Sequence, residues 1–492
     1  MSGNQKTCMR SHARVDAVNK RKGAKLMKAT RLSVSVVLAL IVALMLATGV
    51  AQARKTTVVV WGLNDAVPGG GREMVQEFNR THPDIQIKTQ AQVIGGAGTS
   101  SSIGVTPETM QKLMTAVAAG NPPDIYYMDR FVVAGYAARG VLTPLDEYIK
   151  KDNQYFPACI EEAQYKGNYY AMPFGTDVRV LYWNKDLFRE AGYDPETPPY
   201  TWDELRDYAL KLTKYDKRGN YESIGFIPMY GNSRLYLWGW QNGGELLTED
   251  GKTITMNTEE WTEALEYLTM LYDELGGAKK ISAFSSSFQT GQMDPFMTGK
   301  VGMLAQGNWF ISDIARYNPD LDFGVGPIPV PRERYEQQGR FEGQPQFLSW
   351  SGGWSWVIPK GAKNADAAWE VIKWFTGVEG FEAQAKGDWE YNKSINVPYV
   401  PTMTGLKPAD DLRAERYLPM LVSDNLRKAW DYALSMMAYS RYRPITLAAA
   451  ELYSEQFKAT DNAIFHNMTA QEALDLAVKN AQGALDKLQA EQ

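Results

Sequence analysis

The sequence TTVVVW (Thr56–Trp61), followed by a helix-like segment and by IQIKTQAQ (Ile85–Gln92), is the strongest indication of the fold class. The first run is β-branched and continuous, as in a strand buried on both faces, and the second alternates in polarity. The loop Pro68–Gly71 precedes the predicted helix Arg72–Thr81, which ends at His82-Pro83-Asp84. A β-α-β order implies a parallel sheet with a right-handed crossover. The segment therefore predicts an open α/β fold, in which ligands bind beyond the carboxyl ends of the strands.

Strand-like and helix-like segments continue to alternate along the chain, without an internal repeat. The sequence Thr201-Trp202-Asp203-Glu204 fits a helix-starting capping box. Residues 326–353 are rich in Pro and Gly, which predicts a connecting segment outside the core. From Asp410 onward the pattern predicts almost only helices. The predicted strands are 124–128, 178–183, 300–305 and 354–358, and the predicted helices are 107–119, 131–139, 201–215, 259–275, 308–316, 366–376 and 469–490.

Composition and charge narrow the classes of function. The 492 residues carry a net charge of -5, but after residue 53 the chain has 43 basic and 56 acidic residues, a charge of about -13. Such a surface does not suit phosphate-backbone tracking, so we expect no nucleic-acid partner. After residue 53 the sequence contains one cysteine, Cys159, and two histidines, His82 and His466. We therefore expect neither an intramolecular disulfide nor a Cys-rich metal site there.

The N-terminus has the pattern of a secretory signal peptide. An apolar run, Leu32–Val50, is followed by Ala51-Gln52-Ala53, an A-x-A cleavage signal. Cleavage after Ala53 is the preferred interpretation, with an uncleaved membrane anchor as the alternative. Met27 is an alternative start, because the basic region before the apolar run is long. Lys20, Arg21, Lys22, Lys25, Lys28 and Arg31 are the basic residues nearest to the apolar run. We expect a periplasmic protein, or a cell-surface protein in an organism with one membrane.

The sequence offers few signals of catalysis. It lacks HExxH, GxSxG, P-loop and calcium-loop motifs, and its two distant histidines make a His-based triad improbable. The glycine-rich Gly95–Gly98 lacks the spacing that phosphate binding requires. We therefore predict no catalytic residue, no cofactor and no metal site. The many acidic residues leave a carboxylate pair open, and with it the alternative of a secreted carbohydrate-active hydrolase.

Aromatic residues are the unusual feature, and many stand beside polar residues or glycines after predicted strands. An aromatic face packs against the apolar face of a sugar ring, while Asp, Asn and Arg hydrogen-bond its hydroxyls. This combination predicts a carbohydrate ligand. The candidate binding residues on this ground are Trp61, Asn64, Asp65, Asp129, Arg130, Trp238, Trp240, Asn242, Asn308, Trp309 and Trp354.

Four stretches, in a fixed order, carry a family resemblance. They are Ala119–Ile125 (AGNPPDI) with Gly140–Leu145 (GVLTPL), Tyr182–Phe188 (YWNKDLF), Gly299–Met303 (GKVGM) with Gly307-Asn308-Trp309, and Gly352-Gly353-Trp354 with Ala367–Glu370 (AAWE). Over residues 54–492 the chain resembles the extracellular solute-binding proteins of family 1, the maltose-binding-like receptors of ABC sugar importers.

The resemblance implies a two-lobed periplasmic-binding-protein fold of class II with the ligand cleft between the lobes. Its implied division is a signal peptide at 1–53, an N-lobe at 54–175 and 356–391, a C-lobe at 176–350 and 398–492, and hinge crossovers at 351–355 and 392–397. It implies a carbohydrate receptor, expected to be a monomer, that closes about its hinges and delivers its sugar to the membrane permease subunits of an ABC transporter.

The resemblance also implies site residues. Asp129 and Arg130 correspond to the family's sugar-hydroxyl pair, and Trp309 to its stacking tryptophan. Tyr126 and Asp177 stand where the maltose receptors have a tryptophan and a glutamate. Arg234 lies in the loop 230–234, and Arg441 and Tyr442 are candidates from the C-terminal part. Arg130, Arg179 and Arg234 together leave open an acidic sugar, and a non-sugar solute is a further alternative.

Overall fold

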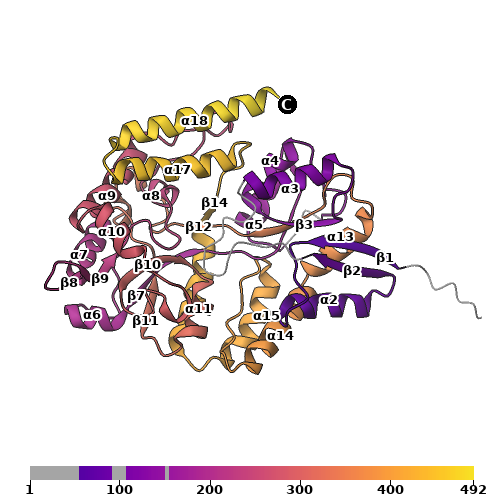
Figure 1. The fold of residues 1–492 in the computed structure, drawn as a ribbon, viewed down its shortest axis with the longest axis horizontal. Helices are drawn as coiled ribbons and strands as arrows, with labels where there is room; N and C mark the ends of the chain where they lie inside the picture. Colours follow the sequence, from indigo (N-terminus) through magenta and orange to yellow (C-terminus); the bar gives the residue numbers. More distant parts are fainter. Residues whose placement is uncertain (1–54, 91–106, 150–153, 492) are drawn as a thin grey trace, which may run out of the picture. The chain divides into compact units, whose positions relative to one another are not determined.

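The computed structural model describes residues 55–90, 107–149 and 154–491, and its main strands form two separate sheets (Figure 1). The first sheet has the order β2(Ile85–Gln90)-β1(Thr56–Trp61)-β3(Ile125–Asp129)-β13(Trp354–Val357)-β6(Met172–Pro173). The second sheet has the order β11(Phe323–Gly326)-β7(Arg179–Asn184)-β10(Val301–Gly307)-β9(Tyr221–Phe226)-β8(Lys214–Tyr215). Two short pairs accompany them, β4(Gln164–Tyr165) with β5(Asn168–Tyr169), and β12(Ser349–Ser351) with β14(Ser440–Tyr442).

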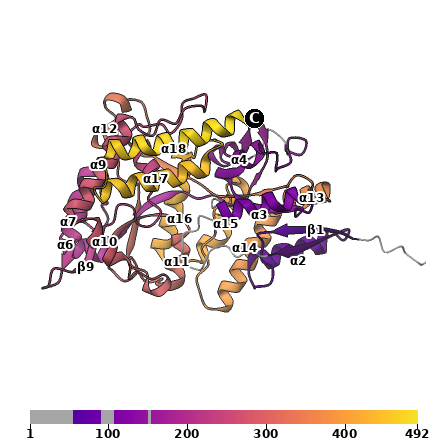
Figure 2. The ribbon, with the colours of Figure 1, turned by 45° about the horizontal axis from the view of Figure 1, so that its top comes forward.

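Helices follow most of the strands and cover both sheets. They are α2(Gly70–Thr81), α3(Pro107–Ala118), α4(Val133–Ala138), α5(Pro157–Glu161), α6(Lys185–Ala191), α7(Trp202–Leu212), α8(Leu235–Gln241), α9(Glu259–Glu274), α10(Ala278–Ser285), α11(Phe310–Tyr317), α12(Arg332–Tyr335), α13(Ala365–Phe375), α14(Val378–Ser394), α15(Lys407–Tyr417), α16(Asp424–Met436), α17(Ala449–Ile464) and α18(Ala470–Ala490). Figure 2 shows α17 and α18 side by side at the C-terminal end of the chain.

Both sheets bury apolar side chains on both faces. In β3, Ile125 belongs to the core beneath α2 and α13, and Met128 belongs to the core beneath α3 and α4. In β7, Leu181 faces the core formed with α7, α9 and α17, and Tyr182 faces the core formed with α11 and α16. Two covered faces explain why these strands read as continuous apolar runs, and they give the α/β architecture that the sequence predicts.

The structure confirms the main elements predicted from the sequence. The strand Thr56–Trp61 is present and pairs in parallel with β3, and Thr201 and Glu204 form the predicted capping box. The helix predicted to reach residue 215 ends at Leu212, because Lys214 and Tyr215 pair with β9 instead. The expected signal peptide at 1–53, the loop 95–98 and the end of the strand predicted for 85–92 lie outside the described residues.

Two places differ from the expected lobe division. Trp354 and Ser355, expected in a hinge crossover, already belong to β13 of the first sheet, where Trp354 pairs with Asp129. Leu406 and Ala409, expected with the second lobe, are buried in the core of the first sheet, because α15 packs against α14. Among the helices of the described residues, each is too short or too polar to traverse a bilayer.

Candidate functional site

A cavity of about 700 Å³, here called the main cavity, is lined by residues that both sheets position. Asp129 ends β3 and Trp354 begins β13 of the first sheet, while Arg179 begins β7 and Trp309 follows β10 of the second sheet. Its other polar and aromatic lining residues are Asp177, Tyr230, Asn232, Arg234, Thr290, Asp294, Gln306, Phe310, Asp313, Tyr317, Trp350, Arg443 and Tyr453. The carboxyl ends of β3 and β10 therefore deliver side chains to one hollow, as expected for an α/β fold.

A smaller cavity of about 290 Å³, here called the side cavity, adjoins the main cavity. The two share Asp177, Trp309, Gly353 and Trp354. The side cavity is also lined by Tyr127, Phe174, Asn308, Ser312, Phe381, Gln384, Thr402, Thr404 and Arg413. Trp309 and Trp354 thus stand where the two hollows meet, and the ring of Trp354 is backed by Tyr127, whose centroid lies 5.1 Å away.

Asp129 is held in the main cavity by a two-point ion pair. Its Oδ1 accepts from the Phe131 amide at 2.9 Å, which fixes the side chain at the end of β3. Arg443, just after β14, donates from Nη2 to Asp129 Oδ1 at 2.6 Å and from Nη1 to Oδ2 at 3.3 Å. Burial lowers the pKa of Arg443, but the carboxylates of Asp129 and Glu162 outweigh burial and raise this pKa overall. Arg443 therefore stays charged and orients the Asp129 carboxylate.

The ion pair continues into the protein through Glu162 and Arg130. Glu162 Oε1 accepts from Arg443 Nε at 3.1 Å, and its Oε2 lies 3.3 Å from Arg130 Nε. The Arg130 guanidinium is fully buried and donates to the carbonyl oxygens of Gly175 (2.8 Å), Trp354 (3.0 Å) and Gly352 (2.5 Å). Arg130 lines neither cavity, because it turns away from Asp129 and binds two segments, here called the first and second crossing segments. The first contains Gly175 and connects β6 to β7, and the second contains Gly352 and connects β12 to β13.

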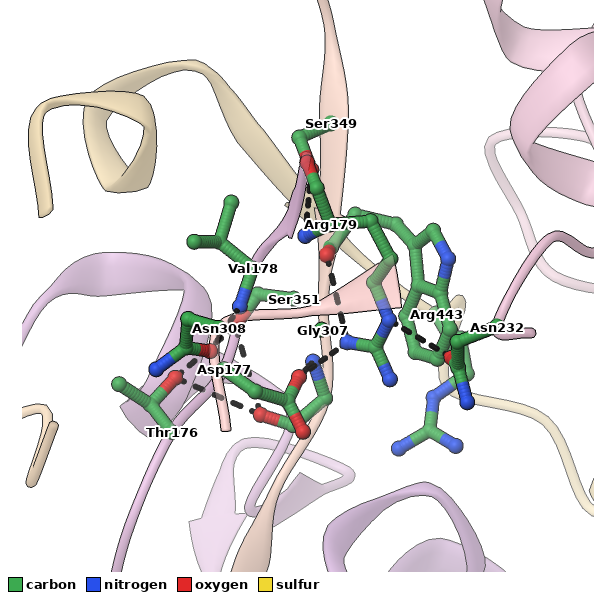
Figure 3. A network of polar contacts seen from close by, with 12 residues as sticks. Thr176, Asp177, Val178, Arg179, Asn232, Gly307, Asn308, Ser349, Ser351 and Arg443 are labelled. Atoms are coloured by element: carbon green, nitrogen blue, oxygen red, sulfur yellow. Dashed lines mark hydrogen bonds and ion pairs between the residues drawn. The ribbon is translucent and has the colours of Figure 1, made fainter. Parts of the chain in front are cut away.

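A second charged pair lies at the first crossing segment (Figure 3). Asp177 Oδ1 accepts from Arg179 Nη1 and, at 2.7 Å, from the Gly352 amide. Arg179 Nε donates to Asn232 Oδ1 at 2.8 Å. The guanidinium carbon of Arg179 lies 3.1 Å from the ring centroid of Trp350 and 5.1 Å from that of Trp309. Burial lowers the pKa of Arg179, and Asp177 opposes that effect.

Two other carboxyl groups of the main cavity, Asp294 and Asp313, form no ion pair with an arginine of the described residues. Asp294 Oδ1 accepts from the amides of Phe296 (2.9 Å) and Met297 (3.4 Å), and burial raises the pKa of Asp294. Burial, together with the charge of Asp294, raises the pKa of Asp313 in α11 to about 6, while Arg316 acts in the opposite direction. These carboxyls can accept, and when protonated donate, hydrogen bonds to ligand hydroxyls.

The structure brings together part of the predicted site. Asp129, Asp177, Arg234, Trp309 and Trp354 line the main cavity, and Asn308 lines the side cavity. The side-chain carbonyl oxygen of Asn308, Oδ1, is occupied within the protein, because it accepts a hydrogen bond from the Val178 amide at 3.0 Å. All of these residues except Arg234, which directly precedes α8, lie at or next to the end of a strand or in the segment between β6 and β7, and this position is their local signal.

Other predicted residues lie elsewhere, and packing explains each case. Trp238 and Trp240 are buried in α8, whose seven residues are all buried, and Trp238 Nε1 donates to Ser233 Oγ at 2.8 Å. Asn242 caps the end of α8 and donates to Glu263 at 2.7 Å. These three positions were expected at a ligand, but the apolar helix carries them into the core of the second sheet.

The remaining candidates lie around the first sheet and in strand β14. Trp61 packs against Tyr126 with ring centroids 6.4 Å apart, and Tyr126 is 2% exposed. Asn64 Oδ1 accepts a hydrogen bond from the Ala66 amide, and Asp65 Oδ1 accepts one from the Thr89 hydroxyl in β2. Arg441 forms a two-point ion pair with Glu245. Burial, together with the negative charge of Glu161, raises the pKa of Tyr442. None of these lines either cavity in the described part of the chain.

Sequence reasoning missed several residues that shape the main cavity. Arg443 and Glu162 have no local motif, and their partners stand 314 and 281 positions away in the chain. Asp294, Asp313 and Trp350 likewise stand outside any recognised stretch. Among the described residues, no group of three or more His, Cys, Asp or Glu side chains could hold a metal ion.

Two α/β sheets that line a shared polar cavity correspond to the two-lobed fold of periplasmic binding proteins, a class in which hinge closure around a ligand occurs. The family of bacterial extracellular solute-binding proteins matches the chain over residues 68–380, which is more than half of its length, and the chain belongs to this family.

Individual relatives bind different solutes. The solved structure of CpMnBP1 with mannobiose bound is 29% identical with a TM-score of 0.66, over 87% of this chain and all of that chain. A maltotriose-binding protein of Pyrococcus abyssi is 26% identical over 62% of this chain and 59% of its own length. The sn-glycerol-3-phosphate-binding periplasmic protein UgpB of Salmonella typhimurium is 27% identical over 58% of this chain and 62% of its own length. The chain thus spans about three fifths of the length of these last two relatives.

Proposed function

We propose that the protein binds a saccharide in the main cavity and serves as the receptor of an ABC importer. The observation that carries this proposal is the meeting of Trp309 and Trp354 with the carboxylates of Asp129 and Asp177 in one hollow. Aromatic faces suit the apolar side of a sugar ring, and carboxylates suit its hydroxyls. The CpMnBP1 likeness supports a di- or oligosaccharide as the ligand.

Binding in this proposal proceeds by closure of two lobes. The proposed division is 54–175 with 356–391, and 176–350 with 398–492, except that all of β13 and helix α15 are assigned to the first of these lobes because they pack with the first sheet. A ligand that contacts Asp129 on one side and Trp309 on the other stabilises the closed form only through contacts that the open form lacks. The closed shape is then what the membrane permease recognises. We further propose export by the N-terminal signal, a periplasmic or cell-surface location, and a monomeric receptor.

The test is a thermal-shift and calorimetric screen of residues 54–492 against malto-, cello-, xylo- and manno-oligosaccharides, with the sugar recovered and analysed by chromatography. A ligand present at 100 times its Kd adds about 2.7 kcal/mol to the free energy of unfolding. A sugar that raises the Tm and is recovered intact supports the receptor. Sugar recovered in cleaved form overturns it in favour of a hydrolase, and no shift with any sugar argues against the ligand class.

A further inference from the structure

Arg234 is a buried cation in the main cavity without a carboxylate partner. Its side chain lies just before α8 and lines the main cavity, and the residue is only 9% exposed. Nη1 donates to the main-chain carbonyls of Ser233 at 2.8 Å and Gly231 at 3.3 Å. Its guanidinium carbon lies 5.2 Å from the ring centroid of Phe457 in α17. Within residues 55–90, 107–149 and 154–491, no carboxylate comes within ion-pair distance of it.

The other arginines of the main cavity are each matched with an acid. Arg443 is paired with Asp129 and Glu162, and Arg179 with Asp177. A buried charge that has no opposite charge is costly, and proteins pair such charges or use them to hold a ligand. Arg234 therefore differs from Arg179 and Arg443, because a negative charge on a ligand could serve as its counter-charge.

We propose that Arg234 forms a subsite for the carboxylate of an acidic saccharide, so that the ligand is a uronate-containing sugar. This proposal rests on the function proposed above and specifies its ligand. A guanidinium matches a carboxylate with two parallel hydrogen bonds, which a neutral hydroxyl cannot reproduce. The sugar rings then extend from Arg234 along the cavity towards Trp309.

The charges of the cavity favour a monoanion over a phosphate. One arginine among the described lining residues is unmatched, and that lining includes no lysine. The same cavity contains Asp294 and Asp313, which disfavour a dianion and suit hydroxyl groups. Among its charged groups without an ion-pair partner in the described residues, the cavity has one basic side chain beside α17 and two carboxyls, one in α11 and one in the loop before β10. A single carboxylate at one end of a hydroxyl-rich ligand matches this arrangement.

The experiment measures affinities of matched neutral and acidic sugars by isothermal titration calorimetry. The probes are mannobiose with dimannuronate, galactobiose with digalacturonate, and glucose 6-phosphate for the phosphate alternative. The variants are Arg234→Gln, which removes the charge, Arg234→Lys, which keeps it without the planar fork, and Arg218→Gln, a matched change on the exposed surface. Melting temperatures without ligand show whether each variant folds.

We expect one uronate disaccharide to bind the wild type at least tenfold more tightly than its neutral counterpart. Arg234→Gln should weaken uronate binding by about 10- to 100-fold, as expected for a charge-assisted hydrogen-bonded pair, and should change the affinity for a neutral sugar by less than about twofold. The uronate affinity of Arg234→Lys should lie between those of the wild type and Arg234→Gln, and the affinity of Arg218→Gln should equal that of the wild type. Uronate binding should also weaken with added salt more than neutral-sugar binding does.

Two outcomes separate this inference from the proposed function. If a neutral disaccharide binds the wild type more tightly than every uronate, the carboxylate subsite is overturned while the saccharide receptor stands. If glucose 6-phosphate binds more tightly than every uronate in an Arg234-dependent way, the anion subsite exists but the carboxylate assignment is wrong. If neither neutral nor acidic sugars bind, both proposals fail.

Discussion

Trp309→Ala is the sharpest test of the proposed site, because this side chain borders both cavities and comes from the second sheet. The tryptophan is half-buried, so its outward face is available to a ligand. A sugar ring stacked on that face removes on the order of 100 Å² of apolar surface from water, worth about 2.5 kcal/mol at about 25 cal/mol/Å². The variant should therefore bind the sugar about 50- to 100-fold more weakly.

The same substitution should disturb the fold far less than it disturbs binding. Arg179 loses one aromatic neighbour, at 5.1 Å, but keeps Trp350, whose ring centroid is 3.1 Å from the guanidinium carbon. Calorimetric titration with the sugar that stabilises the wild type measures the affinity, and thermal unfolding without sugar measures stability. Trp309→Phe should recover part of the affinity, and Trp389→Ala, a half-buried tryptophan outside both cavities, should bind as the wild type does. Unchanged affinity in Trp309→Ala would remove this residue from the site.

Three further changes test the surroundings of the site. Asp129→Asn should weaken sugar binding by about 1–3 kcal/mol in calorimetric titration, since the amide disturbs the pairing with Arg443; wild-type affinity would contradict the assignment. Because the folded-state pKa of Asp313, about 6, exceeds its usual 3.8, its protonated form favours folding below about pH 4 and this benefit is lost as the pH rises to about 6. Asp313→Asn should thus raise the free energy of unfolding at pH 7.5, by about 1–2 kcal/mol after allowance for partial exposure, and change little at pH 3.5; equal effects at both pH values would refute this. Gly353→Ala should lower the Tm more than Gly219→Ala, because both glycines have positive φ but only at Gly353 would the added Cβ meet a carbonyl oxygen, at 2.5 Å; equal losses would exclude the clash.

The elements that the sequence predicted well are those whose burial pattern is periodic. The run Thr56–Trp61 and the amphipathic C-terminal helix both appear as expected. Helix α8 was not predicted, because all seven of its residues are buried and the segment has no polar face that would give helical periodicity. Trp238 and Trp240 were consequently interpreted as ligand contacts, whereas burial in the core accounts for them.

The candidate site could be predicted only where a local signal exists. Asp129 ends a strand, Trp354 begins one and Trp309 follows one, so these residues could be predicted from the positions of the strands. Arg443 acquires its role only when β14 pairs with β12, and nothing near it in the chain indicates a carboxylate partner. Arg130 was placed in the site because it adjoins Asp129, but the helical turn after β3 directs the two side chains apart.

The direction of Arg130 has a consequence for lobe closure. Its guanidinium joins the carbonyls of Gly175 and Gly352, so two crossing segments are held together at one point. The backbone φ of Gly175 is 96° and that of Gly353 is 139°, values that glycine adopts more readily than other residues, so each of the two crossing segments has a glycine beside the Arg130 contacts. We expect rotation about these glycines to accompany lobe closure, while the Phe131 amide holds the Asp129 carboxylate at the end of β3. We expect closure to bring Trp309 towards a carboxylate that is already oriented, which reduces the ordering that binding requires.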